Sequence, residues 1–276
     1  ANRWEAKPLT EEEVARFRAT REETGYEHVV AHASYLINLG SPDEALWRRS
    51  LGALATELAR CRLLGIDRYV LHPGAHMGTG PEVGLQRIAD GLTAALAETD
   101  GSGVTILLEN TAGQGTLLGA TFEELRWLVE HAAPTERLGV CLDTAHAVAA
   151  GYVFGDAAAH EALWGTFDGV IGRERLGALH LNDSKREPGS RVDRHTHIGE
   201  GSLGLEPFRL LVNDPRLQGI PMLLETPKGE DLAEDVMNLA TLRGLVGRLD
   251  PILAPLSGAT AASFATEEQA PVTEDS

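Results

Sequence analysis

The sequence predicts an α/β fold, a TIM-type (β/α)8 barrel, and three observations support this prediction. Six short apolar segments with the character of strands alternate with capped helical segments along the 276 residues. A histidine or carboxylate stands at or near the end of each strand, and these residues lie 34 to 45 positions apart, the length of one strand plus one crossover helix. A barrel brings the carboxyl ends of all its strands to one mouth, whereas a doubly wound sheet gathers only two or three.

The elements are expected in the following order. A first helix begins near Thr10 at a capping box, and a second capping box opens a helix at Thr121. A long helix starts within Ser41–Glu44, with proline in its first turn, and ends before Gly65. The strands are rich in Val, Leu and Ile, as strands buried on both faces are. We expect strands at 28–32, 68–72, 104–110, 139–143, 176–182 and 221–226, and further helices at about 84–98, 121–131, 157–168, 205–212 and 230–247.

Only six of the eight strands of a barrel can be recognised. One helix and a loop precede the strand at 28–32, so the first strand, first helix and second strand of the barrel have no counterpart. We expect one domain, the N-terminally incomplete barrel, over residues 1–250. Residues 251–276 are expected to form a disordered acidic tail, because their composition cannot bury enough apolar surface to offset the entropy of ordering. A docking peptide around Phe264 is the alternative for this tail.

Composition excludes some classes of protein. No apolar run reaches the roughly 18 to 20 residues of a membrane span, and the N-terminus lacks a secretion pattern, so we expect a cytoplasmic protein. Cys61 and Cys141 are expected as small buried hydrophobes, not as a disulfide or as ligands. The net charge of −17 argues against nucleic acid, but bound divalent ions would make the site locally cationic, so an anionic substrate stays possible.

Nine residues of metal-ligand type recur along the chain. Glu109 follows two leucines, where an unpaired charge is costly, and the arginine in a neighbouring strand, Arg68, is at the wrong end. Asp193 and His195 are two apart in an extended segment and therefore point the same way. With His146 they would form a site with an open coordination position, as catalytic metals have. The full set is His32, His72, Glu109, Asp143, His146, His180, Asp193, His195 and Glu225.

The other candidates carry less weight. A Ser-His-Asp triad is disfavoured, because the chain has no Gly-x-Ser-x-Gly elbow. His76 and His197 lie beside ligand loops, where hydrogen bonding to a ligand or to substrate is plausible. His131 and His160 belong to predicted helices and are expected at the surface. The nine residues together therefore predict a polynuclear metal site at the mouth of a barrel.

These motifs resemble one family, the endonuclease IV type of abasic-site (AP) endonucleases, which are metal-dependent DNA repair enzymes on an eight-stranded α/β barrel. The resemblance covers about residues 2 to 248. It rests on the segments His32–Gly40, His72–Gly74, Glu109–Gly115, Asp143–His146, His180–Asp183, Arg191–His195 with Gly199–Gly201, and Leu224–Thr226. Members of the family begin with a strand, a helix and a second strand that this chain lacks, so we expect a fragment or a gene read from a late start.

The resemblance implies three Zn²⁺ ions. The first would take His32, His72 and Glu109; the second would share Glu109 and add Asp143, His180 and Glu225; the third would take His146, Asp193 and His195. It further implies that a hydroxide bridging the first two ions attacks the phosphorus 5′ to an abasic deoxyribose, and that the third ion stabilises the departing 3′ oxygen. Glu109 and Glu225 are the carboxylates expected to be catalytic. Mn²⁺ or Fe²⁺ would suit the same ligands at some positions.

The resemblance also implies double-stranded DNA with abasic sites as the partner, bound by a monomer. Members of the family insert loop side chains into the base stack and flip the abasic sugar into a pocket. Tyr35 and Leu36 match one inserting loop, and Trp4 matches the other, which makes Arg3 a candidate. Expected phosphate contacts are Lys185, Arg191 and Arg194.

Two competing interpretations stay open. The first is a metal-dependent sugar isomerase or epimerase on a related barrel, which would need one or two metals and would have no use for a third site. The second is an inactive truncated product, because a barrel without two adjacent strands exposes sheet edges and an open core. Trimming of 3′ ends is a further activity that the sequence leaves open.

Overall fold

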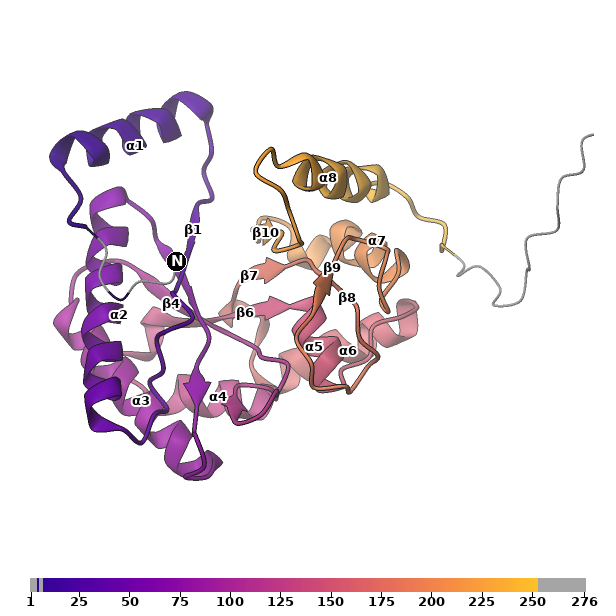
Figure 1. Ribbon diagram of the computed structural model, residues 1–276. Helices are drawn as coiled ribbons and strands as arrows, with labels where there is room; N and C mark the ends of the chain where they lie inside the picture. Colours follow the sequence, from indigo (N-terminus) through magenta and orange to yellow (C-terminus); the bar gives the residue numbers. More distant parts are fainter. Residues whose placement is uncertain (1–3, 5–6, 253–276) are drawn as a thin grey trace, which may run out of the picture.

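A six-stranded, all-parallel sheet organises the molecule in the computed structural model, which describes Trp4 and residues 7–252. The six strands lie side by side in the order in which they occur along the chain, so the order never reverses as it does in a doubly wound fold. This confirms the α/β barrel type that the strand ends predicted, with β1 and β10 at the two edges of the described sheet (Figure 1). The strands are β1 (Val30–His32), β2 (Arg68–Leu71), β4 (Thr105–Glu109), β6 (Leu138–Asp143), β7 (Leu176–His180) and β10 (Met222–Leu223).

Helices cover the outer face of this sheet, and each of them packs against the next one along the chain, apart from the short α5. The helices are α1 (Glu11–Thr24), α2 (Glu44–Leu64), α3 (Pro81–Glu98), α4 (Phe122–His131), α5 (Thr144–Ala150), α6 (Ala157–Val170), α7 (Glu206–Asn213) and α8 (Ala233–Leu245), with 3-10 turns η1 (Thr135–Arg137), η2 (Arg173–Arg175) and η3 (Pro215–Leu217). Two short antiparallel pairs complete the fold, β3 (Gly74–Ala75) with β5 (Leu117–Leu118) and β8 (Asp183–Ser184) with β9 (His195–Thr196).

The capping predictions hold with two corrections. The first box is complete, since Thr10 and Glu13 each bind the other's backbone N–H. The second box is half formed: the Thr121 hydroxyl accepts from the N–H of Glu124, but the Glu124 carboxylate accepts from the two residues before Thr121. The N-cap of α2 is Asp43, so the proline precedes the helix, while Gly65 ends it in the left-handed conformation as predicted.

Alternate residues of each strand face two different cores. One set packs against the helices in the main hydrophobic core, with Ile106, Leu108 and Val140 among its fully buried members. The other set lines the inner face of the sheet and forms a separate small cluster. This inner cluster consists of Val70, Leu107, Cys141 and Ala178, with Val30 and Leu223 packed against it. Burial on both faces explains why these strands read as continuous apolar runs.

The other expectations about the fold have mixed outcomes. Helix α5 and the two short antiparallel pairs were not predicted. Both cysteines are buried and free, as expected. Across Trp4 and residues 7–252, none of the helices combines the length and apolarity needed to cross a membrane. Arg3 lies outside the described residues, and so do residues 253–276, nearly all of the expected tail. The boundary between domain and tail at residue 250 therefore stays a prediction.

Candidate metal centre

Six of the nine candidate ligands ring the carboxyl ends of the six parallel strands. Four are the last residue of their strand, and His72 and Glu225 follow β2 and β10 by one and two residues. In each strand, the residue two positions earlier belongs to the inner apolar cluster. Because side chains alternate along a strand, all six ligands point inward, directly above that apolar layer. The six are His32, His72, Glu109, Asp143, His180 and Glu225.

Glu109 is the centre of this ring, and its side chain is fully buried. Its Oε2 lies 2.9 Å from Nε2 of His32 and 2.9 Å from Nε2 of His72. Its Oε1 lies 3.0 Å from Nδ1 of His180 and 3.3 Å from Nδ1 of His146. Burial acts to raise the pKa of Glu109, but the charges of His72 and His180 outweigh it and hold the pKa well below its usual value. One buried carboxylate therefore joins four histidines.

A second group adjoins the ring and is built from three other elements. His146 comes from α5, His195 from β9, and Asp193 from the loop before β9. The Asp193 carboxylate lies 3.3 Å from Nε2 of His146 and 3.2 Å from Nε2 of His195, and the two Nε2 atoms are 3.3 Å apart. Nε2 of His195 is also 3.8 Å from Oδ2 of Asp143, which connects this group to the ring. Asp193, His195 and His146 therefore lie together, and their role as a clamp for a metal ion stays a prediction.

Backbone carbonyls fix which nitrogen three of the five histidines present. Nδ1 of His32 lies 2.8 Å from its neighbour's carbonyl, Nδ1 of His146 lies 2.9 Å from the carbonyl of Asn110, and Nδ1 of His195 lies 3.2 Å from that of Glu225. A carbonyl can only accept, so each Nδ1 carries the proton and each Nε2 is left as a ligand atom. His180 is turned the other way, with Nδ1 toward Glu109 and, at 3.3 Å, toward Glu225.

The donor set fits divalent metal ions. Five imidazoles and four carboxylates are typical ligands of Zn²⁺ and also suit Mn²⁺ and Fe²⁺. Three groups have ligand atoms within 4.8 Å of one another, about twice the length of a zinc–ligand bond. The groups are His32, Glu109, His180 and Glu225; His72, Glu109 and His146; and Asp143, His146 and His195. These groups combine the residues differently from the three expected ligand sets. Which residues bind which ion therefore stays a prediction.

The ionisation of the cluster shows why it attracts cations. A hydrogen bond from His146 is the main cause that lowers the pKa of Asp193. Burial would lower the pKa of His146, but the charge of Asp143 and bonds to Asp193 and Glu109 raise it well above its usual value. A proton on His146 therefore helps to neutralise the carboxylates beside it in the metal-free chain, and a metal ion would replace such a proton.

Five of the six predicted DNA contacts belong to the described residues. Tyr35 is 69% exposed and Leu36 is half-buried, on the loop that follows His32. Lys185, Arg191 and Arg194 are exposed on the segment between β7 and β9. Arg191 has a positive φ of 54°, a conformation that non-glycine residues rarely adopt and that clusters at functional loops. Arg194 donates to the backbone carbonyl of Asp193 at 2.6 Å, so this basic side chain is held beside a candidate ligand.

Sequence reasoning missed four buried polar residues that lie close to the candidate ligands in the sequence. The amides of Asn110 and Asn182 bond to Asp143, and the hydroxyl of Thr144 bonds to the carbonyl of Asn182 at 2.6 Å. The Asp183 carboxylate accepts four backbone N–H groups and thereby shapes the loop at 199–203. The signal was available, because each of the four lies within three positions of a predicted ligand and would be costly to bury without a partner.

The remaining histidines differ from expectation in part. His131 is exposed, as predicted. His160 was expected at the surface, but it is buried and bonds to Asp214 at 2.8 Å, since it faces η3 across the core side of α6. His76 accepts the N–H groups of Gly78 and Gly80, so it organises its own loop. His197 contacts the Asn238 amide at 3.1 Å, and Asn238 in turn bonds to Thr226 beside Glu225.

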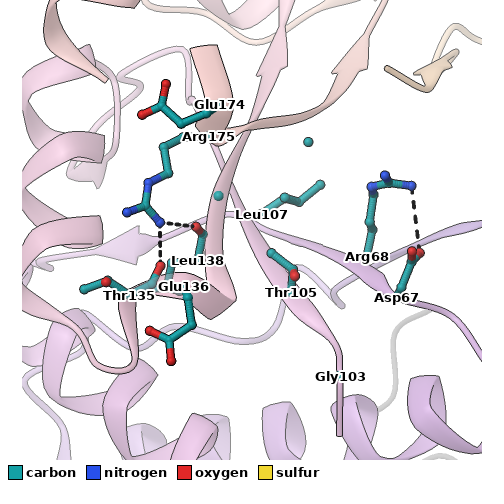
Figure 2. A pocket seen from close by; sticks show the side chains of 12 residues that line it. Asp67, Arg68, Gly103, Thr105, Leu107, Thr135, Glu136, Leu138, Glu174 and Arg175 are labelled. Atoms are coloured by element: carbon teal, nitrogen blue, oxygen red, sulfur yellow. Dashed lines mark hydrogen bonds and ion pairs between the residues drawn. The ribbon is translucent and has the colours of Figure 1, made fainter. Parts of the chain in front are cut away.

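A cavity of about 550 Å³ lies at the other end of the sheet, at the amino ends of β2, β4, β6 and β7 (Figure 2). Its wall carries Arg68, Glu136, Glu174 and Arg175. Arginine cannot ligate a metal, and the two arginines bind backbone carbonyls or a neighbouring carboxylate. The candidate site is therefore at the carboxyl ends, even though this cavity is large.

The fold and the cluster together define an α/β barrel able to bind metals, of the xylose isomerase-like type. A family model described as "Xylose isomerase-like TIM barrel" matches residues 1–242. The protein belongs, within that fold, to the endonuclease 4 family. It is 54% identical to "Probable endonuclease 4" of Chloroflexus aggregans, over 88% of this chain and 85% of that protein. It is 48% identical to "Probable endonuclease 4" of Geobacter sulfurreducens, over 90% of this chain and 84% of that protein. The crystal structure of endonuclease IV from Thermus thermophilus matches with a TM-score of 0.76 at 40% identity, over 88% of this chain and 84% of that one.

Proposed function

We propose that this protein is a DNA repair nuclease that hydrolyses the phosphodiester bond 5′ to abasic sites and leaves a 3′-hydroxyl and a 5′-deoxyribose phosphate. One observation carries the proposal: nine histidines and carboxylates converge as a ring around Glu109 and an adjoining group around Asp193. Relatives named "Probable endonuclease 4" support it, because their sequence identity to this chain is 42 to 54% over most of its length.

Three Zn²⁺ ions are the proposed cofactors. His32, His72 and Glu109 would hold the first, Asp143, His180 and Glu225 with Glu109 the second, and His146, Asp193 and His195 the third. When bound, the ions supply a nucleophile at neutral pH and stabilise charge on both the attacking and the leaving oxygen. Two ions in the ring and a third in the adjoining group suit phosphodiester hydrolysis, which needs no side-chain nucleophile.

The two carboxylates proposed as catalytic have different environments. Glu109 is buried beneath four histidines and stays ionised, so it can hold these side chains in place. The side chain of Glu225 is 35% exposed, and its backbone carbonyl also contacts His195. Burial acts to raise the pKa of Glu225, but its bond with His180 lowers it. Glu225 therefore presents an ionised, partly exposed carboxylate, which can orient water against the substrate phosphate.

A second hollow, of about 340 Å³, opens beside the ring and suits the substrate proposed here. His32, His72 and Asp193 form its metal-facing wall, and Ile37, Leu71 and Leu117 are among its apolar walls. A deoxyribose without a base would place its apolar face against the apolar walls. Its phosphate would then lie against the metal-facing wall. Tyr35 at its rim is a candidate for filling the space left in the base stack, together with Leu36.

The proposed DNA-binding surface must act against a net charge of −17. Lys185, Arg191 and Arg194 are the proposed phosphate contacts, and bound metal ions would add positive charge at the same place. We propose that the protein acts as a monomer in the cytoplasm. A sugar isomerase is the less favoured function: solved epimerases match at 16 to 20% identity, which shows the fold alone, and such an enzyme has no use for the group around Asp193.

The test is incision of a duplex with one abasic site by the unchanged chain, by Glu225→Gln and by the matched control Glu123→Gln, with metal analysis of each. Glu123 is exposed on α4, away from the ring. We expect close to three metals per chain, incision by the parent and the control, and at least about a hundredfold slower incision by Glu225→Gln. Unchanged incision by Glu225→Gln, or one metal per chain with turnover of a ketose, would contradict the proposal.

A further inference from the structure

Two asparagines without an assigned role lie directly behind the ligands. Asn110 follows Glu109 at the end of β4, and Asn182 lies two residues after His180 at the end of β7. Both are fully buried, with 0% exposure. Their side chains approach Asp143 from opposite sides, because β4 and β7 are the two neighbours of β6 in the sheet.

Asn110 continues the β-ladder beyond the end of β4. Its Oδ1 accepts the N–H of Asp143 at 2.7 Å, and its Nδ2 donates to the carbonyl of Asp143 at 3.1 Å. The side chain thus satisfies both the N–H and the carbonyl of Asp143 on the side of β4. Its own carbonyl faces Nδ1 of His146 at 2.9 Å, which leaves Nε2 of that histidine toward Asp193. One asparagine therefore fixes the backbone of one ligand and the tautomer of another.

Asn182 joins β6 to the segment after β10. Its Nδ2 donates to Oδ2 of Asp143 at 2.6 Å, and its Oδ1 accepts the N–H of Glu225 at 2.8 Å. The other oxygen of Asp143, Oδ1, accepts the N–H of His146 at 2.8 Å. Each oxygen of the Asp143 carboxylate therefore has one fixed donor, so the plane of the carboxylate is set before any ion binds.

We propose that Asn110 and Asn182 are positioning residues that aim Asp143, His146 and Glu225 at the metal ions; this rests on the metal centre proposed above. An amide suits the task because it offers a donor and an acceptor at once and adds no charge to the carboxylates around it. A carboxylate at position 182 would have almost the same shape, but it would face Asp143 with repulsion in place of a hydrogen bond. Residues that orient metal ligands typically affect metal affinity or activity by about 10- to 100-fold.

The decisive variant is Asn182→Asp, with Asn213→Asp as the matched control. Asn213 makes the same kinds of bonds, to the carbonyls of Arg209 and Leu245 and the N–H of Gly247, but it lies between α7 and α8 away from the ligands. The measurements are zinc per chain after dialysis, the rise in melting temperature on adding zinc to the metal-free chain, and kcat for incision. Asn110→Asp is the second variant if Asn182→Asp does not fold.

Asn182→Asp is expected to lose about one zinc per chain, most of the zinc-induced rise in melting temperature, and about 10- to 100-fold in kcat. Asn213→Asp is expected to lower the melting temperature of the metal-free chain but to keep the parent's zinc content and zinc-induced rise. Parent-like zinc content and rise in Asn182→Asp, or an equal loss in the control, would overturn the proposal. If the parent does not incise abasic DNA, the proposed function fails, and the zinc measurements still decide the role of Asn182.

Discussion

The two ends of the sheet use charged side chains in opposite ways. At the amino ends, Arg175 donates to the carbonyls of Thr135 and Leu138 at 2.6 and 3.1 Å, so a permanent cation satisfies backbone oxygens (Figure 2). At the carboxyl ends, Glu109 and Asp143 are sealed among histidines whose charge depends on protonation. Both arrangements compensate buried charge and polarity, but only the second can exchange its protons for metal ions.

This difference shows that parallel strands alone do not create a site. The strand directions bring six residues together at each end of the sheet equally well. What separates the ends is the kind of residue: arginine keeps its charge and cannot ligate a metal, whereas neutral histidine and ionised carboxylate are ligands. The carboxyl ends should therefore govern metal binding and incision, and the amino ends should govern stability alone.

The largest expected effect is that of Glu109→Gln, which removes the charge at the centre of the ring. Incision and zinc binding should fall by more than about a hundredfold, since even residues that only support a ligand cost about 10- to 100-fold. The metal-free chain should lose about 3 to 5 kcal/mol, because a buried partner of several charged histidines is gone. Zinc titration and denaturant unfolding measure both. Zinc binding as tight as in the parent would mean that Glu109 is only structural.

An intermediate effect is expected from pH. The raised pKa of His146 means that its stabilising contribution is complete below about pH 6.5 and is lost as the pH rises. The lowered pKa of Glu109 means that its contribution is present above about pH 4.5 and is lost as the pH falls. The metal-free chain should therefore be most stable between these values, whereas stabilisation by zinc should grow from about pH 6 to about pH 8. Melting temperatures with and without zinc test this; parallel pH profiles would contradict it.

The smallest effect on function is expected at the opposite end, for Arg175→Met. This change removes two hydrogen bonds from a charged donor to backbone carbonyls and should lower the free energy of unfolding by about 1 to 3 kcal/mol. Zinc content and the rate of incision should equal those of the parent, because no ligand is touched. Thermal melts and incision assays at a temperature where both chains are folded provide the check. A loss of zinc would show that the two ends are coupled.

Much of the fold and of the ring could be predicted because both follow from local rules. Glu109 after two leucines and Asp143 after a Val-Cys-Leu run mark carboxylates at the ends of buried strands, and parallel strands bring such ends together. Helix α5 was missed because it begins directly after Asp143, whose carboxylate caps it, so that one residue ends a strand and starts a helix. His160 was misplaced because its partner Asp214 is 54 positions away.

The sequence by itself determined the parallel α/β architecture and the nine residues that gather at one end of it. Strand period, apolar runs and capping residues are local, and the inward direction of each ligand follows from alternation along a strand. Only the tertiary structure decided which atoms meet: that Glu109 joins four histidines, that four imidazoles turn Nε2 inward while His180 turns Nδ1, and that two asparagines hold Asp143. Those contacts depend on the tilt and register of strands far apart in the chain, which no local pattern records.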